Sequence, residues 1–224
     1  MTHDPDDPEG ERPPADDPER DLMRRWAAGE ARAGDILIQR FFPLIHAYFR
    51  RRAHENQEDL VQETFLRFAA SAQRYRGTAS VRIFVYGIAR NVFFEYLDAQ
   101  SKAARFDPMT SSLFEATGRR MSSMLAQREE HQLLLNALQD IPVVVQELID
   151  LRYFRSLTGP ELRDLFGIPE GTVRYRIRAA LEQLAAAYVR RAGQQHELEV
   201  GELELERWLA ELRSQDERSQ DEPD

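Results

Sequence analysis

The stretch from Leu165 to Leu184, LFGIPEGTVRYRIRAALEQL, decides the fold of the C-terminal half of the chain. It opens with two glycines and a proline within five residues. An apolar helical pattern follows, in which Val173, Ile177 and Leu181 recur at every fourth position. A short helix, a glycine-containing turn and a second helix together form a helix–turn–helix, and the stretch predicts this motif.

The start of the second helix is basic. Arg174, Arg176 and Arg178 alternate along it, and no acidic residue lies between Thr172 and Arg178. The second helix of such a motif lays its N-terminal side chains into the major groove of DNA. The planar fork of arginine binds a guanine edge or a phosphate. A plain helical hairpin with a solvated basic face is the alternative. The turn, the capping spacing of Thr158 and Glu161, and the arginine run together favour DNA binding.

Helical spacing of apolar residues continues through most of the chain. It covers residues 21–52, with a break marked by Gly29 and Gly34, and resumes after a capping Asn56. A polar loop over residues 74–80 precedes a long helix from Val81. Asp140 followed by Ile141 and Pro142 signals the start of a further helix, which carries Val145, Leu148, Ile149 and Tyr153. No alternating pattern typical of strands is sustained, so the fold class is predicted to be all-α.

Residues 103–127 break the helical periodicity with Asp-Pro, glycine and several serines and threonines, which is typical of a linker. We therefore expect two small helical domains joined by a flexible linker. The expected boundaries are an acidic disordered tail at 1–20, a first domain at 21–102, the linker at 103–127, a second domain at 128–192 and an acidic extension at 193–224.

Charge is divided unevenly along the chain. Residues 1–20 carry −6 and residues 194–224 carry −8, so residues 21–193 carry +5 of the formal total of −9. A basic body between acidic ends suits a protein that meets a polyanion. Solvated tails are the simpler explanation of the acidic ends, and for residues 1–20 it is the favoured one.

Composition argues against several classes. The chain has no cysteine, and its five histidines lack the spacing of metal ligands. No hydrolase or phosphate-binding motif occurs, so neither an enzyme nor a cofactor is expected. A nuclease metal site on Glu58, Asp59 and Glu63 is the enzymatic alternative. The apolar runs are too short to cross a membrane and the N-terminus is no signal peptide, so a cytoplasmic protein is expected.

Two stretches resemble bacterial RNA polymerase sigma factors. LQDIPVVVQELIDLRYFRSLTGPELRDLFGIPEGTVRYRIRAALEQL (138–184) resembles their region 4. EDLVQETFLRF (58–68) and RYRGTASVRIFVYGIARNVFFEYL (74–97) resemble their region 2. Because only these two regions are present, the chain resembles the small extracytoplasmic-function (ECF) class. The resemblance implies a sigma factor that binds core polymerase through its β′ coiled coil and β flap, recognises −35 and −10 promoter elements and initiates transcription. It also makes an anti-sigma factor a typical partner.

The resemblance also assigns roles to residues. It places core-polymerase binding on Asp59, Leu60, Gln62, Glu63 and Leu66. It places −10 DNA binding on Arg74, Tyr75, Arg76, Gly77, Thr78, Ser80, Arg90 and Asn91. It places −35 DNA binding on Arg155, Thr158, Thr172, Arg174, Tyr175, Arg176 and Arg178. Simpler roles compete with these: Tyr75 as a core anchor, Asn91 as the partner of a helix neighbour, and the acidic residues as a solvated face.

The extension beyond residue 193 lies outside the resemblance. Leu205, Trp208, Leu209 and Leu212 fall on one helical stripe among glutamates, which predicts an acidic amphipathic helix. The helix could fold back on the basic domain and compete with DNA, dock a regulator, or extend the core. Two alternatives remain for the whole chain: a helix–turn–helix regulator that acts without polymerase, and a sigma-like protein that has lost initiation activity.

Overall fold

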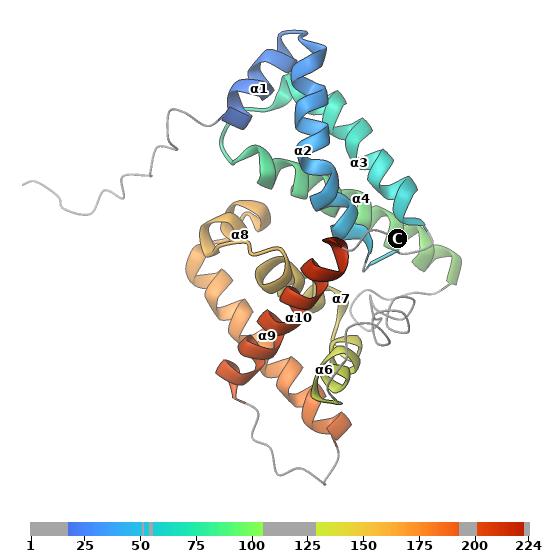
Figure 1. The fold of residues 1–224 in the computed structure, drawn as a ribbon, viewed down its shortest axis with the longest axis vertical. Coiled ribbons are helices and arrows are strands. Elements are labelled where there is room, and N and C mark those ends of the chain that lie inside the picture. The colour runs from blue at the N-terminus through green and yellow to red at the C-terminus, as the bar shows by residue number, and fades with distance from the viewer. Residues whose placement is uncertain (1–17, 51, 54–55, 105–128, 193–200, 222–224) are drawn as a thin grey trace, which may run out of the picture.

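The computed structural model describes residues 18–50, 52–53, 56–104, 129–192 and 201–221. All its regular elements in these ranges are helices, which confirms the all-α prediction. Figure 1 shows them as two groups, α1–α4 above and α6–α10 below. We call these the N-terminal half and the C-terminal half. None of the described helices combines the length and the apolar character needed to cross a membrane.

The N-terminal half is built around aromatic side chains. Its elements are α1 (Pro18–Ala27), α2 (Ala31–Arg50), α3 (Gln57–Ser71), the short 3-10 helix η2 (Ala72–Arg74) and α4 (Val81–Ala104). Phe41, Tyr48, Phe68 and Phe93 are almost completely buried. Phe68 meets Phe41 edge-on, with ring centroids 6.4 Å apart. Such large apolar side chains, burying about 150–250 Å² each, fix how the helices pack.

The C-terminal half contains the predicted helix–turn–helix. Its elements are α6 (Glu129–Gln139), α7 (Val143–Ile149), the π-helical turn η3 (Asp150–Phe154), α8 (Gly159–Phe166), α9 (Glu170–Ala192) and α10 (Glu202–Asp221). Leu134, Leu157, Leu162 and Leu184 are fully buried between them. The helix–turn–helix is α8–α9, and α6, α7 and α10 brace it.

Two local predictions are corrected. The turn between α1 and α2 is at Gly29, whose φ is +100°, whereas Gly34 lies inside α2. Asn56 makes no capping hydrogen bond to α3 and instead donates to the Tyr96 hydroxyl at 3.0 Å. The helix expected after Asp140 is α7, and the Asp140 carboxylate accepts two hydrogen bonds from Arg191 at 2.6 and 2.7 Å.

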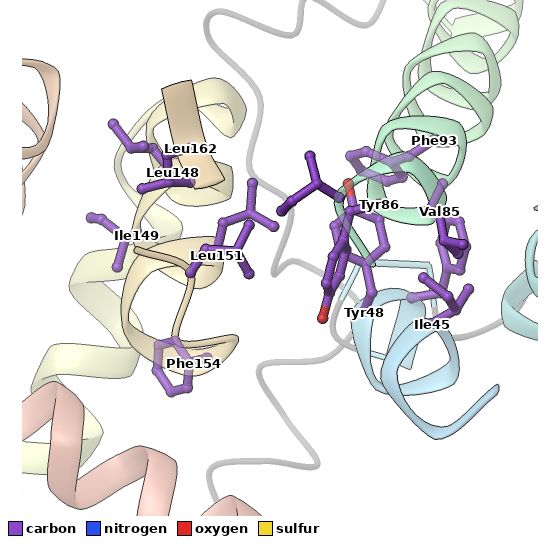
Figure 2. Close-up of a cluster of buried hydrophobic side chains, with 14 of the residues drawn as sticks. Ile45, Tyr48, Val85, Tyr86, Phe93, Leu148, Ile149, Leu151, Phe154 and Leu162 are labelled. Carbon is purple, nitrogen blue, oxygen red and sulfur yellow. The ribbon is translucent and has the colours of Figure 1, made fainter. Parts of the chain in front are cut away.

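The two halves share one hydrophobic core. Buried side chains from both halves belong to a single cluster. Figure 2 shows Tyr48, Tyr86 and Phe93 of α2 and α4 facing Leu148 and Leu151 of α7 and η3. The expected linker falls almost entirely outside the described residues, as does the acidic tail up to residue 17. The structure therefore does not test the flexibility predicted for these segments.

Candidate nucleic-acid interface

The turn between α8 and α9 is built from local signals. The Thr158 backbone N–H donates to the Glu161 carboxylate at 2.8 Å, and the Glu161 N–H donates to the Thr158 hydroxyl at 3.4 Å, which completes the predicted capping box. Gly167 ends α8 with φ +63°, a left-handed conformation that favours glycine. The chain then turns into α9 at Glu170. These signals set the angle at which α9 leaves the motif.

The N-terminal part of α9 presents a cationic face. Val173 and Leu181 are buried, so the polar positions between them lie on the outer sides of the helix. The outward set is exposed and consists of Arg174, Tyr175, Arg176 and Arg178, with Thr172 half-buried beside it. Tyr175 is 72% exposed. We call Thr172, Arg174, Tyr175, Arg176 and Arg178 the recognition face. Within the described residues this face makes a single ion pair, a 3.8 Å contact between Arg174 and Glu170 of the same helix, so its side chains can reach a groove.

The two remaining −35 residues differ from each other. Thr158 is exposed at the start of α8. Arg155 is 8% exposed, and its Nε lies 3.4 Å from Asp150. The structure therefore does not present Arg155 for phosphate contact, because its guanidinium is paired with the buried carboxylate of Asp150.

The loop before α4 divides into exposed and anchoring residues. Arg74, Arg76 and Thr78 are exposed, and Gly77 has φ +71°. The Tyr75 hydroxyl donates to the Ala79 carbonyl at 2.6 Å, and its ring packs 5.2 Å from that of Phe84. Tyr75 thus holds the loop in shape, which is the simpler role considered from sequence. The two exposed arginines are the groups of this loop best placed to meet a nucleic-acid backbone.

On α4 itself the predicted residues have different surroundings. The Ser80 hydroxyl accepts from the Ile83 N–H at 3.2 Å and so caps the helix. Asn91 is exposed. Arg90 is partly buried, and its Nε donates to Glu147 of the C-terminal half at 3.1 Å. The structure therefore brings Arg74 and Asn91 to one surface hollow, whereas Arg90 is engaged by the carboxylate of Glu147.

The outer face of α3 is acidic with an apolar centre. Asp59 and Gln62 are exposed, Glu63 is partly exposed, and Leu66 is 59% exposed. Leu60 is 7% exposed and packs in the core, so it cannot touch a partner directly. A large exposed leucine among carboxylates and amides resembles the centre of a protein–protein contact more than a solvated face. We call Asp59, Gln62, Glu63 and Leu66 the α3 face.

Two buried carboxylates were not predicted as functional. Glu147 of α7 is 1% exposed and accepts from the Tyr48 hydroxyl and from Arg90, both at 3.1 Å. Asp150 of η3 accepts from Arg52 at 2.8 Å. Burial raises the pKa of Glu147, and the nearby charges of Arg90 and Arg52 only partly oppose this. Glu147 stood in the matched sequence pattern, but its partners lie 57 and 99 residues away, so no local signal identifies them.

The C-terminal extension forms the predicted amphipathic helix, α10. Leu205, Leu209 and Leu212 are fully buried, and the Trp208 ring lies 5.1 Å from Tyr188 of α9. The Tyr153 hydroxyl donates to Glu206 at 2.7 Å. Of the three roles considered from sequence, this packing favours core extension, because the apolar stripe is already buried against other helices of the same chain. Its contacts include His131 of α6, Tyr153 of η3 and Tyr188 near the C-terminal end of α9.

The nuclease alternative finds no support in the described ranges. No group of three or more His, Asp or Glu side chains there is arranged to hold a metal ion. Glu63 is instead paired with Arg67 at 2.6 Å, and Arg67 also meets Glu95 at 2.7 Å. Through its pair with Glu95, Arg67 joins α3 to α4 beside the α3 face.

Comparison with known proteins shows which protein family the sequence resembles. The sequence profile of Sigma-70 region 2 matches residues 37–103, which span α2 to α4. The ECF RNA polymerase sigma-E factors of Salmonella typhimurium and Escherichia coli strain K12 are each 25% identical over 172 residues, covering 73% of this chain and 90% of theirs. Residues 37–103 therefore match a Sigma-70 region 2, and the chain is similar to ECF sigma factors over most of its length. These similarities support a sigma factor function in RNA polymerase-dependent transcription.

Further comparisons show the same similarity to ECF sigma factors. The ECF RNA polymerase sigma-E factor of Haemophilus influenzae is 24% identical, with 73% of this chain and 91% of that protein covered. A solved structure of CnrH in complex with the cytosolic domain of CnrY matches with a TM-score of 0.50 and 20% identity. It covers 76% of this chain and 96% of CnrH, and at this identity it supports the fold alone.

Proposed function

We propose that this chain is an ECF sigma factor that binds core RNA polymerase and recognises −35 and −10 promoter elements, so that transcription starts at the promoters it selects. In this proposal residues 21–102 bind polymerase and the −10 element, and residues 128–192 bind the −35 element. The observation that carries it is the recognition face of α9, which stands exposed at the end of a well-capped helix–turn–helix.

Promoter recognition is supported by the chemistry of that face. Its three arginines and a threonine supply donors for base edges and phosphates, and Tyr175 supplies a flat apolar surface. Arginines that meet only phosphates fix the register without reading sequence. We assign melting of the −10 element to Arg74, Arg76, Thr78 and Asn91. A separated strand needs cations for its phosphates and polar groups for its bases, held in place by an ordered loop.

Polymerase binding is supported by the α3 face. It offers an apolar centre, Leu66, with acidic and amide groups around it, which fits a basic helical partner. An anti-sigma factor is a further proposed partner. The matched CnrH structure contains the cytosolic domain of CnrY.

Run-off transcription with purified core polymerase on a library of promoters tests the proposal. Wild-type chain should select promoters with paired −35 and −10 elements and open them only with core present. Arg178→Ala should weaken −35 recognition, and loss of a phosphate contact lowers the salt slope of binding by about 1. Glu182→Ala, an exposed change further along α9, is the matched control. Specific DNA binding without core, and no transcription with it, would favour a regulator that acts alone.

A further inference from the structure

The turn that leads into α8 has an unusual backbone conformation at Ser156. This exposed serine has φ +55°, in the left-handed region that residues other than glycine adopt only at a cost in free energy. A serine keeps such a conformation where the surrounding structure holds it there. The contacts around Ser156 therefore decide how the chain enters α8.

The residue after Ser156 is tied to η3. The Leu157 N–H donates to the Leu151 carbonyl at 3.0 Å, and Nη1 of Arg152 donates to the Leu157 carbonyl at 3.1 Å. The Leu157 side chain is fully buried. These contacts hold the backbone on one side of Ser156 and leave its hydroxyl to a partner from outside the turn.

That partner is Arg213 of α10. Its Nη1 donates to the Ser156 hydroxyl at 2.7 Å, across 57 residues of sequence. Arg213 directly follows Leu212, which is fully buried, so the packing of α10 fixes the point from which the guanidinium reaches out. This hydrogen bond joins the C-terminal extension to the entry of the helix–turn–helix.

Other polar contacts fix the register of α10. Glu206 accepts from the Tyr153 hydroxyl of η3 at 2.7 Å, and the Glu211 carboxylate lies 3.0 Å from Nε2 of His131 in α6. Figure 1 shows α10 lying beside α9 in the C-terminal half. An apolar stripe alone would tolerate small rotations and shifts, whereas hydrogen bonds have preferred distances and directions. Arg213 is therefore presented to Ser156 from a defined position.

The turn at Ser156 controls a part of the surface proposed to meet the −35 element. Thr158, two residues later, is exposed and caps α8. The α8 helix is anchored by the fully buried Leu162 and passes through Gly167 into α9. A shift of the turn therefore moves Thr158 and tilts α8 together with the helix that follows it. Base contacts depend on side chains that lie within hydrogen-bond distance, so small tilts weaken them.

We propose that Arg213 is a positioning residue for −35 recognition: its hydrogen bond to Ser156 holds the entry to α8, so that Thr158 and the recognition face meet DNA at one fixed angle. This role rests on the proposed function and extends it to the C-terminal extension. The ligand is the duplex −35 element, and Arg213 acts on its binding through Ser156.

Promoter binding by the full chain in complex with core polymerase tests this role. Arg213→Ala should lower the preference for a matched over a scrambled −35 duplex by about fivefold, the lower end for one misplaced base contact. Arg213→Lys should recover most of the preference, because an ammonium group also donates to a hydroxyl. The control is Arg207→Ala, since Arg207 is 62% exposed and pairs with Glu204 of the same helix. An equal loss in the control, or no loss in Arg213→Ala, would overturn the proposal.

Ser156→Ala removes the same hydrogen bond from the other side. It should show the same loss of −35 preference, and Ser156→Ala/Arg213→Ala should lose no more than either single variant, because both changes remove one interaction. A loss confined to Arg213→Ala would mean that the guanidinium meets DNA directly, and positioning through Ser156 would be wrong.

Hydrogen exchange separates positioning from a general loss of stability. In both single variants the Leu157 N–H should exchange faster than in wild type, while the thermal unfolding midpoint should match that of Arg207→Ala. Unchanged exchange at Leu157, or a midpoint that falls together with the −35 preference, would overturn the proposal. Failure of wild type itself to prefer the matched −35 duplex in the presence of core would overturn the proposed function instead.

Discussion

Gly34 in α2 lies directly against the ring of Trp26. A Cβ at this position would come within 2.4 Å of two ring atoms of that tryptophan, much closer than atoms can approach. The absence of a side chain therefore lets α1 and α2 pack closely, a role unrelated to backbone flexibility.

Gly34→Ala should destabilise the protein by about 1–3 kcal/mol, because the indole ring must move away from its packed position. The measurement is urea denaturation followed by circular dichroism. Gly171→Ala is the control, since nothing lies within 4 Å of a Cβ there and alanine favours a helix by up to about 1 kcal/mol. Equal stability of the two variants would contradict the packing argument.

Asp140 and Arg191 join the end of α6 to the end of α9. Hydrogen bonds from Arg191 lower the pKa of Asp140 below its ordinary value of 3.8, against the opposing effect of burial. A carboxyl whose pKa is lower in the folded state stabilises the fold above its unfolded pKa. That stabilisation disappears as the pH falls through the folded value.

Asp140→Asn should therefore cost stability at pH 7, by about 0.5–1 kcal/mol because the pair is partly exposed. The difference from wild type should shrink as the pH falls below 3.8. Urea denaturation of both proteins between pH 7 and pH 3 measures this. A difference that grows with acid would show that Asp140 acts through something other than its charge.

At the scale of elements, α10 is part of the fold of the C-terminal half. Its stripe is buried against α9 and η3, with Trp208 packed on Tyr188. Trp208→Ala should lower the free energy of unfolding by about 3–5 kcal/mol, as expected for a large buried aromatic. Leu203→Ala on the same helix, where the side chain is 83% exposed, should change it little.

Thermal denaturation of the two variants checks this prediction. Removal of residues 194–224 should likewise destabilise the C-terminal half. If α10 only extends the core, this truncation should not increase the affinity for promoter DNA. A truncated chain that stays as stable as wild type and binds promoters more tightly would instead support the fold-back role considered from sequence.

The sequence predicted elements whose signals are local. Thr158, Glu161 and Gly167 act within one or two helical turns, so α8 and its turn could be recognised without a structure. The amphipathic pattern of α10 was equally visible, but a stripe does not say which surface it covers. The burial of Glu147 could not be predicted from the local sequence, because it depends on the side chains that the other half of the chain packs against it.

At the scale of the whole molecule, Asp150 connects the halves. Its carboxylate meets Arg52 of the N-terminal half at 2.8 Å and Arg155 of its own half at 3.4 Å. The nearby hydrophobic side chains of both halves belong to one cluster, so the halves are expected to unfold together. The ion pairs lie inside this shared core and resist separation only while their charges match.

Asp150→Asn should break this coupling more severely than Arg52→Met. The asparagine leaves two buried guanidinium groups without a countercharge, which costs about 3–5 kcal/mol, whereas Arg52→Met leaves Asp150 its contact with Arg155. The double variant should lose less than the sum of the single losses, because each change removes the same pair. In calorimetry, the single transition of wild type should separate into two for Asp150→Asn, while the exposed control Glu182→Gln keeps one. One unchanged transition in Asp150→Asn would mean that apolar packing alone holds the halves together.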